Sequence, residues 1–165
     1  MSASYFRTLI GYNRWAWNRV LDQVAALTLE QYTSRQFNFG SVRSTLSHIS
    51  GTENSYIARL TGQPVQPRRE DDFPTFASLR DRWERQFEEQ KKFADSLTDE
   101  MTRQEFSYIG GNGQEVRMRR DLYLAQLINH STQHRAETAM AITEFGHSPG
   151  DLDVSLYVRE VGASA

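Results

Sequence analysis

The chain of 165 residues contains no cysteine, and this absence removes several kinds of chemistry. Disulfides, cysteine-ligated zinc sites, iron–sulfur clusters and cysteine nucleophiles are all excluded. The sequence also lacks an apolar run continuous enough for a signal peptide or long enough for a transmembrane helix. We therefore expect a cytoplasmic protein without a membrane partner.

The chain has little net charge of either sign. Its 19 Lys and Arg residues against 21 Asp and Glu residues give a formal net charge of −2. A dedicated nucleic-acid-binding protein usually carries a strong excess of positive charge, so we expect no nucleic-acid partner. The length and the apolar fraction of 38% predict one globular domain over residues 1–165.

Apolar residues recur at helical spacing in four parts of the chain. These segments run from about residue 3 to 27, from 41 to 60, from 75 to 97 and from 119 to 145. In the second segment the apolar stripe advances alternately by four and three residues, which is typical of helices packed in a bundle. The helical pattern is lost over residues 28–40, and the prolines between residues 62 and 74 predict a loop.

A short hairpin is predicted before the last helix. Residues 105–109 and 114–118 flank a glycine-rich stretch that contains Asn112-Gly113, and Asn-Gly is a strong hairpin signal. A C-terminal segment over residues 151–161 is apolar but too short to be stable alone, so it should pack on the bundle or on a partner chain. The sequence thus predicts an all-α, antiparallel four-helix bundle with a hairpin and a C-terminal extension.

Three of the four histidines are candidates for metal binding. His130 and His134 are four residues apart, which places them about 40° apart around a helix and one turn apart along it. Their imidazoles can therefore reach one point. His48 lies beside the apolar stripe of the second predicted helix, and four-helix bundles build metal sites from side chains on facing helices. The row that we expect to face the interior reads Tyr123, Leu127, His130, His134, Glu137 and Ala141.

Three neutral imidazoles that leave one coordination position open are typical of a catalytic divalent metal site. The ligand chemistry permits zinc, nickel, iron or copper and does not choose between them. The alternative is that these histidines are ordinary core or surface residues whose nitrogens are satisfied by hydrogen bonds.

The chain resembles the DinB/YfiT-like metalloenzymes, a superfamily of four-helix bundles. The matching stretches are Tyr12-Asn13-Arg14-Trp15-Ala16, Thr45-Leu46-Ser47-His48-Ile49, Glu53, Arg59-Leu60-Thr61-Gly62, Leu127-Ile128-Asn129-His130-Ser131-Thr132-Gln133-His134-Arg135, and Gly146-His147-Ser148-Pro149 with Asp153 and Tyr157. The resemblance implies that His48, His130 and His134 bind a divalent metal ion, zinc or nickel, with iron or manganese as alternatives. It also implies a homodimer. Characterised relatives include S-transferases and isomerases that use low-molecular-weight thiols.

The chain departs from the family pattern after the last histidine, where Ala136 and Glu137 replace Gly and Gln. Glu137 has three interpretations. It could orient a ligand imidazole, act as a general base on a metal-bound water, or pair with an arginine without any chemical role.

Two more polar residues fall on inward rows. Glu53 occupies a position that should be apolar, so it is either paired or close to the metal site. Asn13 could bond a neighbouring backbone group or support the site. Arg117, Arg119 and Arg120 crowd the start of the last helix, where they could receive an anionic ligand or pair with surface acids.

Three functions remain open at this point. The first is a metal-dependent enzyme that acts on a small molecule, by thiol transfer or isomerisation as the resemblance suggests, or by hydrolysis. The second is a non-catalytic protein that binds a metal or a small ligand in a stress response. The third is a helical interaction module with vestigial histidines.

Overall fold

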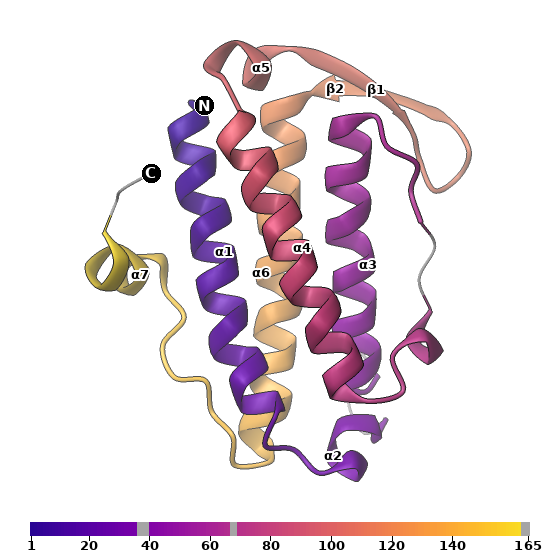
Figure 1. The fold of residues 1–165 in the computed structure, drawn as a ribbon, viewed down its shortest axis with the longest axis vertical. Helices are drawn as coiled ribbons and strands as arrows, with labels where there is room; N and C mark the ends of the chain where they lie inside the picture. Colours follow the sequence, from indigo (N-terminus) through magenta and orange to yellow (C-terminus); the bar gives the residue numbers. More distant parts are fainter. Residues whose placement is uncertain (36–39, 67–68, 163–165) are drawn as a thin grey trace.

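The computed structural model describes residues 1–35, 40–66 and 69–162. Its elements in chain order are α1 (Ala3–Val24), α2 (Leu29–Thr33), α3 (Val42–Thr61), the 3-10 turn η1 (Glu70–Asp72), α4 (Phe76–Ser96), α5 (Asp99–Arg103), β1 (Glu105–Ile109), β2 (Glu115–Arg119), α6 (Arg120–Glu144) and α7 (Val154–Val161) (Figure 1). The predicted four long helices, the hairpin and the C-terminal extension are all present. Parts of two predicted loops, residues 36–39 and Pro67, lie outside the described residues.

The long helices α1, α3, α4 and α6 form the bundle. Helix α1 packs on α4 and α6, and helix α3 packs on the same two. Arg120 at the start of α6 donates to the carbonyl of Leu60 at the end of α3 (2.9 Å), so these two helices are antiparallel. The N-terminal ammonium instead lies 3.3 Å from Asp121 at the start of α6, so α1 and α6 run in the same direction (Figure 1). The bundle thus combines antiparallel and parallel neighbours.

Local signals define where the helices begin and end. The hydroxyl of Ser41 accepts from the backbone of Ser44 at the start of α3, and Gly62 ends that helix with a positive φ of 70°. Residues 28–40 were predicted to be non-helical, but they include α2, which Thr28 and Gln31 start with a reciprocal capping box. The apolar pattern missed α2 because five residues are too few to display a helical stripe.

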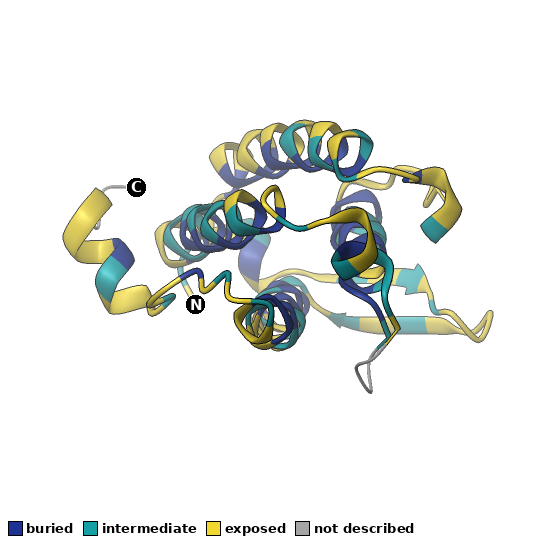
Figure 2. Ribbon diagram, turned by 90° about the horizontal axis from the view of Figure 1, so that it is seen from below, coloured by how far each residue is buried: buried dark blue, intermediate teal, exposed yellow. Residues whose placement is uncertain are grey.

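The core lies between the faces that the four long helices turn toward one another (Figure 2). Trp17 and Trp83 are completely buried and meet at its centre, with ring centroids 4.8 Å apart. The C-terminal segment packs on the outside of α1, where Tyr157 of α7 is buried and the Tyr12 hydroxyl donates to the carbonyl of Leu152 (2.9 Å). Within the described ranges, no helix is long and apolar enough to cross a membrane.

Candidate metal centre

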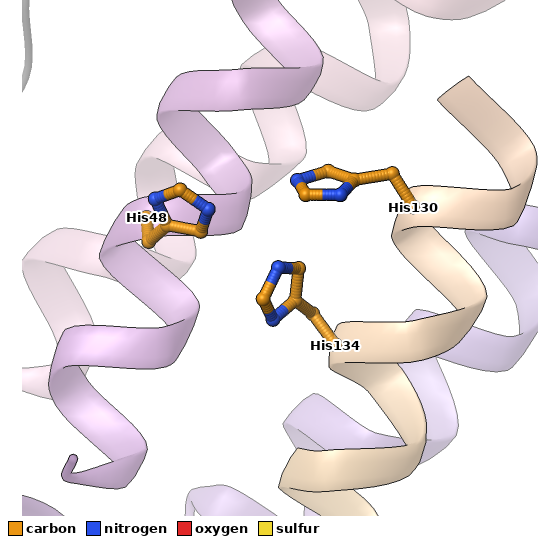
Figure 3. Close-up of side chains that lie close together, drawn as sticks. All are labelled: His48, His130 and His134. Carbon is orange, nitrogen blue, oxygen red and sulfur yellow. The ribbon is translucent and has the colours of Figure 1, made fainter. Parts of the chain in front are cut away.

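Three imidazole rings converge between α3 and α6. His48 extends from α3 and His130 and His134 from α6, and one nitrogen of each ring lies within 4.8 Å of the other two (Figure 3). Zinc–imidazole bonds are about 2.0–2.1 Å long, so ring nitrogens as far apart as this limit move closer together when they bind a single ion. Among the described residues, no other His, Asp or Glu belongs to this cluster.

The donor atoms suit a metal ion. Nε2 of His130 is buried and has no hydrogen-bond partner in the described part of the chain. Burial lowers the pKa of His130 below its ordinary value, and the neighbouring His134 and His48 lower it further. The pKa of His48 is also lowered, first by the protein atoms around its ring and then by His134. Both imidazoles are therefore neutral near pH 7, which is the form that binds metals.

Glu137 holds the third imidazole. Its Oε2 lies 2.6 Å from Nδ1 of His134, one turn earlier on α6. An ionised carboxylate only accepts hydrogen bonds, so Nδ1 of His134 donates and its Nε2 is left free. Glu137 forms no ion pair with an arginine in the described structure; its other contact is the Gln133 amide at 3.5 Å. Of the three interpretations of Glu137, this arrangement matches the orienting one.

The histidines lie at the margin of the bundle, not in its interior as the predicted inward row implied. His48 is exposed, and His130 and His134 are half-buried. The buried residues of α6 are Asp121, Tyr123, Leu124, Leu127, Ser131, Arg135, Thr138, Ala141 and Ile142. The predicted row is confirmed for Tyr123, Leu127 and Ala141, which are buried. Its three polar members lie at the edge of that face, because Ser131 and Arg135, one position after each histidine, are buried in their place.

Glu53 and Asn13 belong to a buried polar network. Glu53 is fully buried, and its carboxylate accepts from the amides of Asn13 (3.1 Å), Gln86 (3.1 Å) and Gln90 (2.6 Å). The Ser131 hydroxyl lies 2.6 Å from the same carboxylate. Glu53 is therefore paired inside the core. Its satisfied hydrogen bonds explain how a carboxylate occupies an apolar stripe.

Arg135 extends this network toward α1. Its guanidinium donates to Oδ1 of Asn13 (2.7 Å) and to the Tyr12 hydroxyl (2.9 Å), and it lies over the Tyr12 ring. The network thus joins one buried cation and one buried carboxylate through Asn13. Because Ser131 and Arg135 follow His130 and His134 directly, the network sets the rotation of α6 that turns both imidazoles toward α3.

Two further side chains on α3 were not singled out by the sequence analysis, one beside His130 and one farther along the helix from His48. The Tyr56 ring lies 6.3 Å from the His130 ring, and burial raises the pKa of its hydroxyl. Arg59 lines the same surface groove as His48. The helical spacing of eight and eleven residues after His48 is the signal that could have identified both.

The arginines that the sequence analysis considered for anion binding have other partners. Arg117 pairs with Glu105 (2.6 Å), and Arg119 pairs with Asp121 (2.6 Å). Arg120 donates to the Leu60 carbonyl and lies over the Phe106 ring. Arg117 and Arg119 therefore match the alternative of cations paired with acids, whereas Arg120 instead joins α6 to the end of α3.

Comparison with known proteins gives one family and one fold. The model of the DinB family matches residues 1–161. The solved structure of YfiT from Bacillus subtilis, described as a probable metal-dependent hydrolase with an unusual four-helix bundle topology, superposes with a TM-score of 0.68 at 18% sequence identity. The match covers 90% of this chain and 91% of the YfiT chain. No curated protein matches the sequence.

Proposed function

The chain belongs to the DinB family, and we propose that it is a metal-dependent enzyme that acts on a small-molecule substrate. The observation that carries this proposal is the convergence of His48, His130 and His134. A structural zinc site normally has four protein ligands, whereas this cluster offers three within the described residues. A coordination position therefore remains for a reacting molecule, at a place that solvent reaches.

We propose that the ion is zinc or nickel, with iron or manganese as alternatives. Imidazole nitrogen suits zinc, nickel and iron, while manganese prefers oxygen ligands. When bound, such an ion supplies Lewis-acid chemistry. The three imidazoles would hold the ion, and the Glu137 carboxylate keeps His134 in the tautomer whose Nε2 faces the cluster.

Two classes of reaction are compatible with this centre. The family resemblance favours thiol transfer or isomerisation, and in that case the thiol must be a low-molecular-weight co-substrate because the chain has no cysteine. The description of YfiT favours hydrolysis. For hydrolysis, the prediction of Glu137 as a general base requires its carboxylate to exchange the 2.6 Å contact with Nδ1 of His134 for one with water. The homodimer, the cytoplasmic location and a stress-response role remain predictions.

The first test is the metal content per chain, measured by inductively coupled plasma mass spectrometry on protein purified without a metal-binding tag. We expect about one equivalent in the wild type, loss of the metal in His130→Ala, and retention in His147→Ala, the matched control outside the cluster. Absence of metal from the wild type after incubation with zinc, nickel, iron and manganese would contradict the proposal.

The second test separates catalysis from a purely structural metal site. The metal-loaded protein is assayed with low-molecular-weight thiols plus electrophiles, and separately with ester and amide substrates. An enzyme loses turnover in His134→Ala while it largely keeps its melting temperature. A large fall in the melting temperature without any turnover in the wild type would instead indicate a structural metal.

A further inference from the structure

A groove on the surface of α3 includes His48, one of the three residues of the proposed metal centre. It has a volume of about 290 Å³ and is lined by Ser47, His48, Gly51, Thr52, Ser55 and Arg59, with Val65 and Gln66 on its other side. His48 and Arg59 are eleven residues apart, or about 16 Å along the helix axis at 1.5 Å per residue. The guanidinium of Arg59 lies at the far end of the groove, against Tyr108 and Tyr123.

Arg59 has no carboxylate partner in the part of the chain that the structure describes. Its guanidinium donates to the hydroxyl of Tyr123 (3.3 Å) and lies over the ring of Tyr108 at 5.0 Å, and both are uncharged groups. Its Nε is buried without any partner. Arginines elsewhere on the surface, such as Arg14 and Arg80, do pair with acids. The terminal N–H groups of Arg59 that do not bond Tyr123 therefore have no acidic partner among the described residues and can bind an anion.

The hydroxyl groups of the groove determine which polar groups a ligand can present to it. The hydroxyl of Ser47, which is 5% exposed, has no hydrogen-bond partner among the described residues. The hydroxyls of Thr52 and Ser55 donate to carbonyls of their own helix, so toward a ligand they can only accept. No described residue that lines the groove is Asp or Glu, so no protein anion competes for Arg59.

We propose that this groove binds the substrate, and that the substrate is an extended small molecule that ends in a carboxylate bound by Arg59. The opposite end of the molecule carries the reacting group, at His48 and the proposed metal ion. Hydrogen-bond donors along the middle of the molecule face Thr52 and Ser55. The planar guanidinium fork matches the two oxygens of a carboxylate, which explains the choice of arginine at this position. This inference rests on the proposed function, because His48 is the residue that the groove shares with the proposed metal centre.

The test uses probes that bind zinc through a hydroxamate. Monohydroxamates of the dicarboxylic acids from glutaric to sebacic acid carry a carboxylate at the far end, and alkyl hydroxamates of equal length end in a methyl group. Binding to the zinc-loaded protein is measured by isothermal titration calorimetry. For at least one chain length, we expect the carboxylate probe to bind about 10- to 100-fold more tightly than its methyl counterpart, the range of charge-assisted hydrogen bonds.

Variants assign this preference to Arg59. Arg59→Met should abolish the tighter binding of the carboxylate probe. Arg59→Lys should retain only part of it, because lysine keeps the positive charge but cannot donate two parallel hydrogen bonds to a carboxylate. Arg85→Met, which removes the same charge from an exposed position on α4, should leave it unchanged. Circular dichroism verifies that each variant is folded.

The outcomes separate the two proposals. Equal binding of both probe types to wild-type protein that holds zinc, or no binding of either, overturns the groove inference and leaves the metal centre intact. A preference that persists in folded Arg59→Met also overturns it. A protein that does not retain zinc contradicts the proposed function itself.

Discussion

Nδ1 of His134 lies 2.6 Å from Oε2 of Glu137, and this contact determines which nitrogen of the imidazole faces His48 and His130. Carboxylates that hold a ligand histidine in this way typically strengthen metal binding. We therefore expect Glu137→Gln to weaken zinc affinity by about 10- to 100-fold. Competition with a chromophoric chelator measures the affinity directly.

The matched control for this change is Glu144→Gln, an isosteric substitution at an exposed position of the same helix. It should leave the zinc affinity unchanged. If both variants bind zinc as tightly as the wild type, Glu137 does not orient the imidazole.

The buried network makes a prediction about stability. Asn13 links the carboxylate of Glu53 to the guanidinium of Arg135, and all three side chains are at most 2% exposed. Arg135→Met leaves the Glu53 charge buried without a cation, so we expect a loss of about 3–5 kcal/mol in the free energy of unfolding. Guanidinium denaturation followed by circular dichroism measures this loss.

Arg80→Met serves as the comparison, because its partners Asp22 and Glu84 are exposed. Exposed ion pairs contribute about 0–1 kcal/mol, so the effect should be small. An Arg135→Met variant no less stable than Arg80→Met would show that the network does not stabilise the fold.

The stability of the metal-free protein should depend on the histidines below neutral pH. The pKa values of His48 and His130 are lowered in the folded chain, first by burial and then by neighbouring histidines, while the unfolded value is about 6.5. The unfolded chain therefore binds more protons below that pH, and the free energy of unfolding falls as the pH drops from about 6.5 toward the folded pKa values.

The measurement is the free energy of unfolding as a function of pH in the presence of a chelator. The double variant His48→Gln/His130→Gln should lose less stability on acidification than the wild type over this range. Superimposable profiles for the two proteins would contradict the assignment.

The docking of α7 on α1 depends on a glycine. A Cβ atom at Gly11 would lie 2.5 Å from the hydroxyl of Tyr157, which is too close. Gly11→Ala should therefore loosen α7 and raise the hydrogen-exchange rates of its backbone amides, even though alanine favours the α1 helix itself. Hydrogen exchange followed by mass spectrometry resolves this segment.

Removal of the hydroxyl should relieve the clash. We expect the double variant Gly11→Ala/Tyr157→Phe to recover most of the protection that Gly11→Ala loses. Equal exchange in the wild type and in Gly11→Ala would show that the tyrosine ring moves aside at little cost.

The sequence was sufficient for the features that local spacing controls. The four long helices, the hairpin next to Asn112-Gly113 and the convergence of His130 with His134 each depend on residues a few positions apart. Such features can be predicted because the helical repeat and the turn chemistry act within one element. The one helix in the described residues that the sequence pattern did not predict between the first two long helices is α2, whose five residues are too few to show a helical repeat.

The tertiary structure decided which side chains meet across the bundle. The burial of Ser131 and Arg135 depends on partners supplied by α1 and α3, so a pattern that places polar residues outside did not include them in the buried face of α6. The sequence also could not reveal that Arg59 lacks an acidic partner among the described residues, because this can be recognised only when the positions of the neighbouring acids are known. The sequence by itself determined the helices and their candidate ligands. Packing between distant segments decided their rotation, their relative direction and the groove beside the histidines, because these depend on contacts that no local pattern encodes.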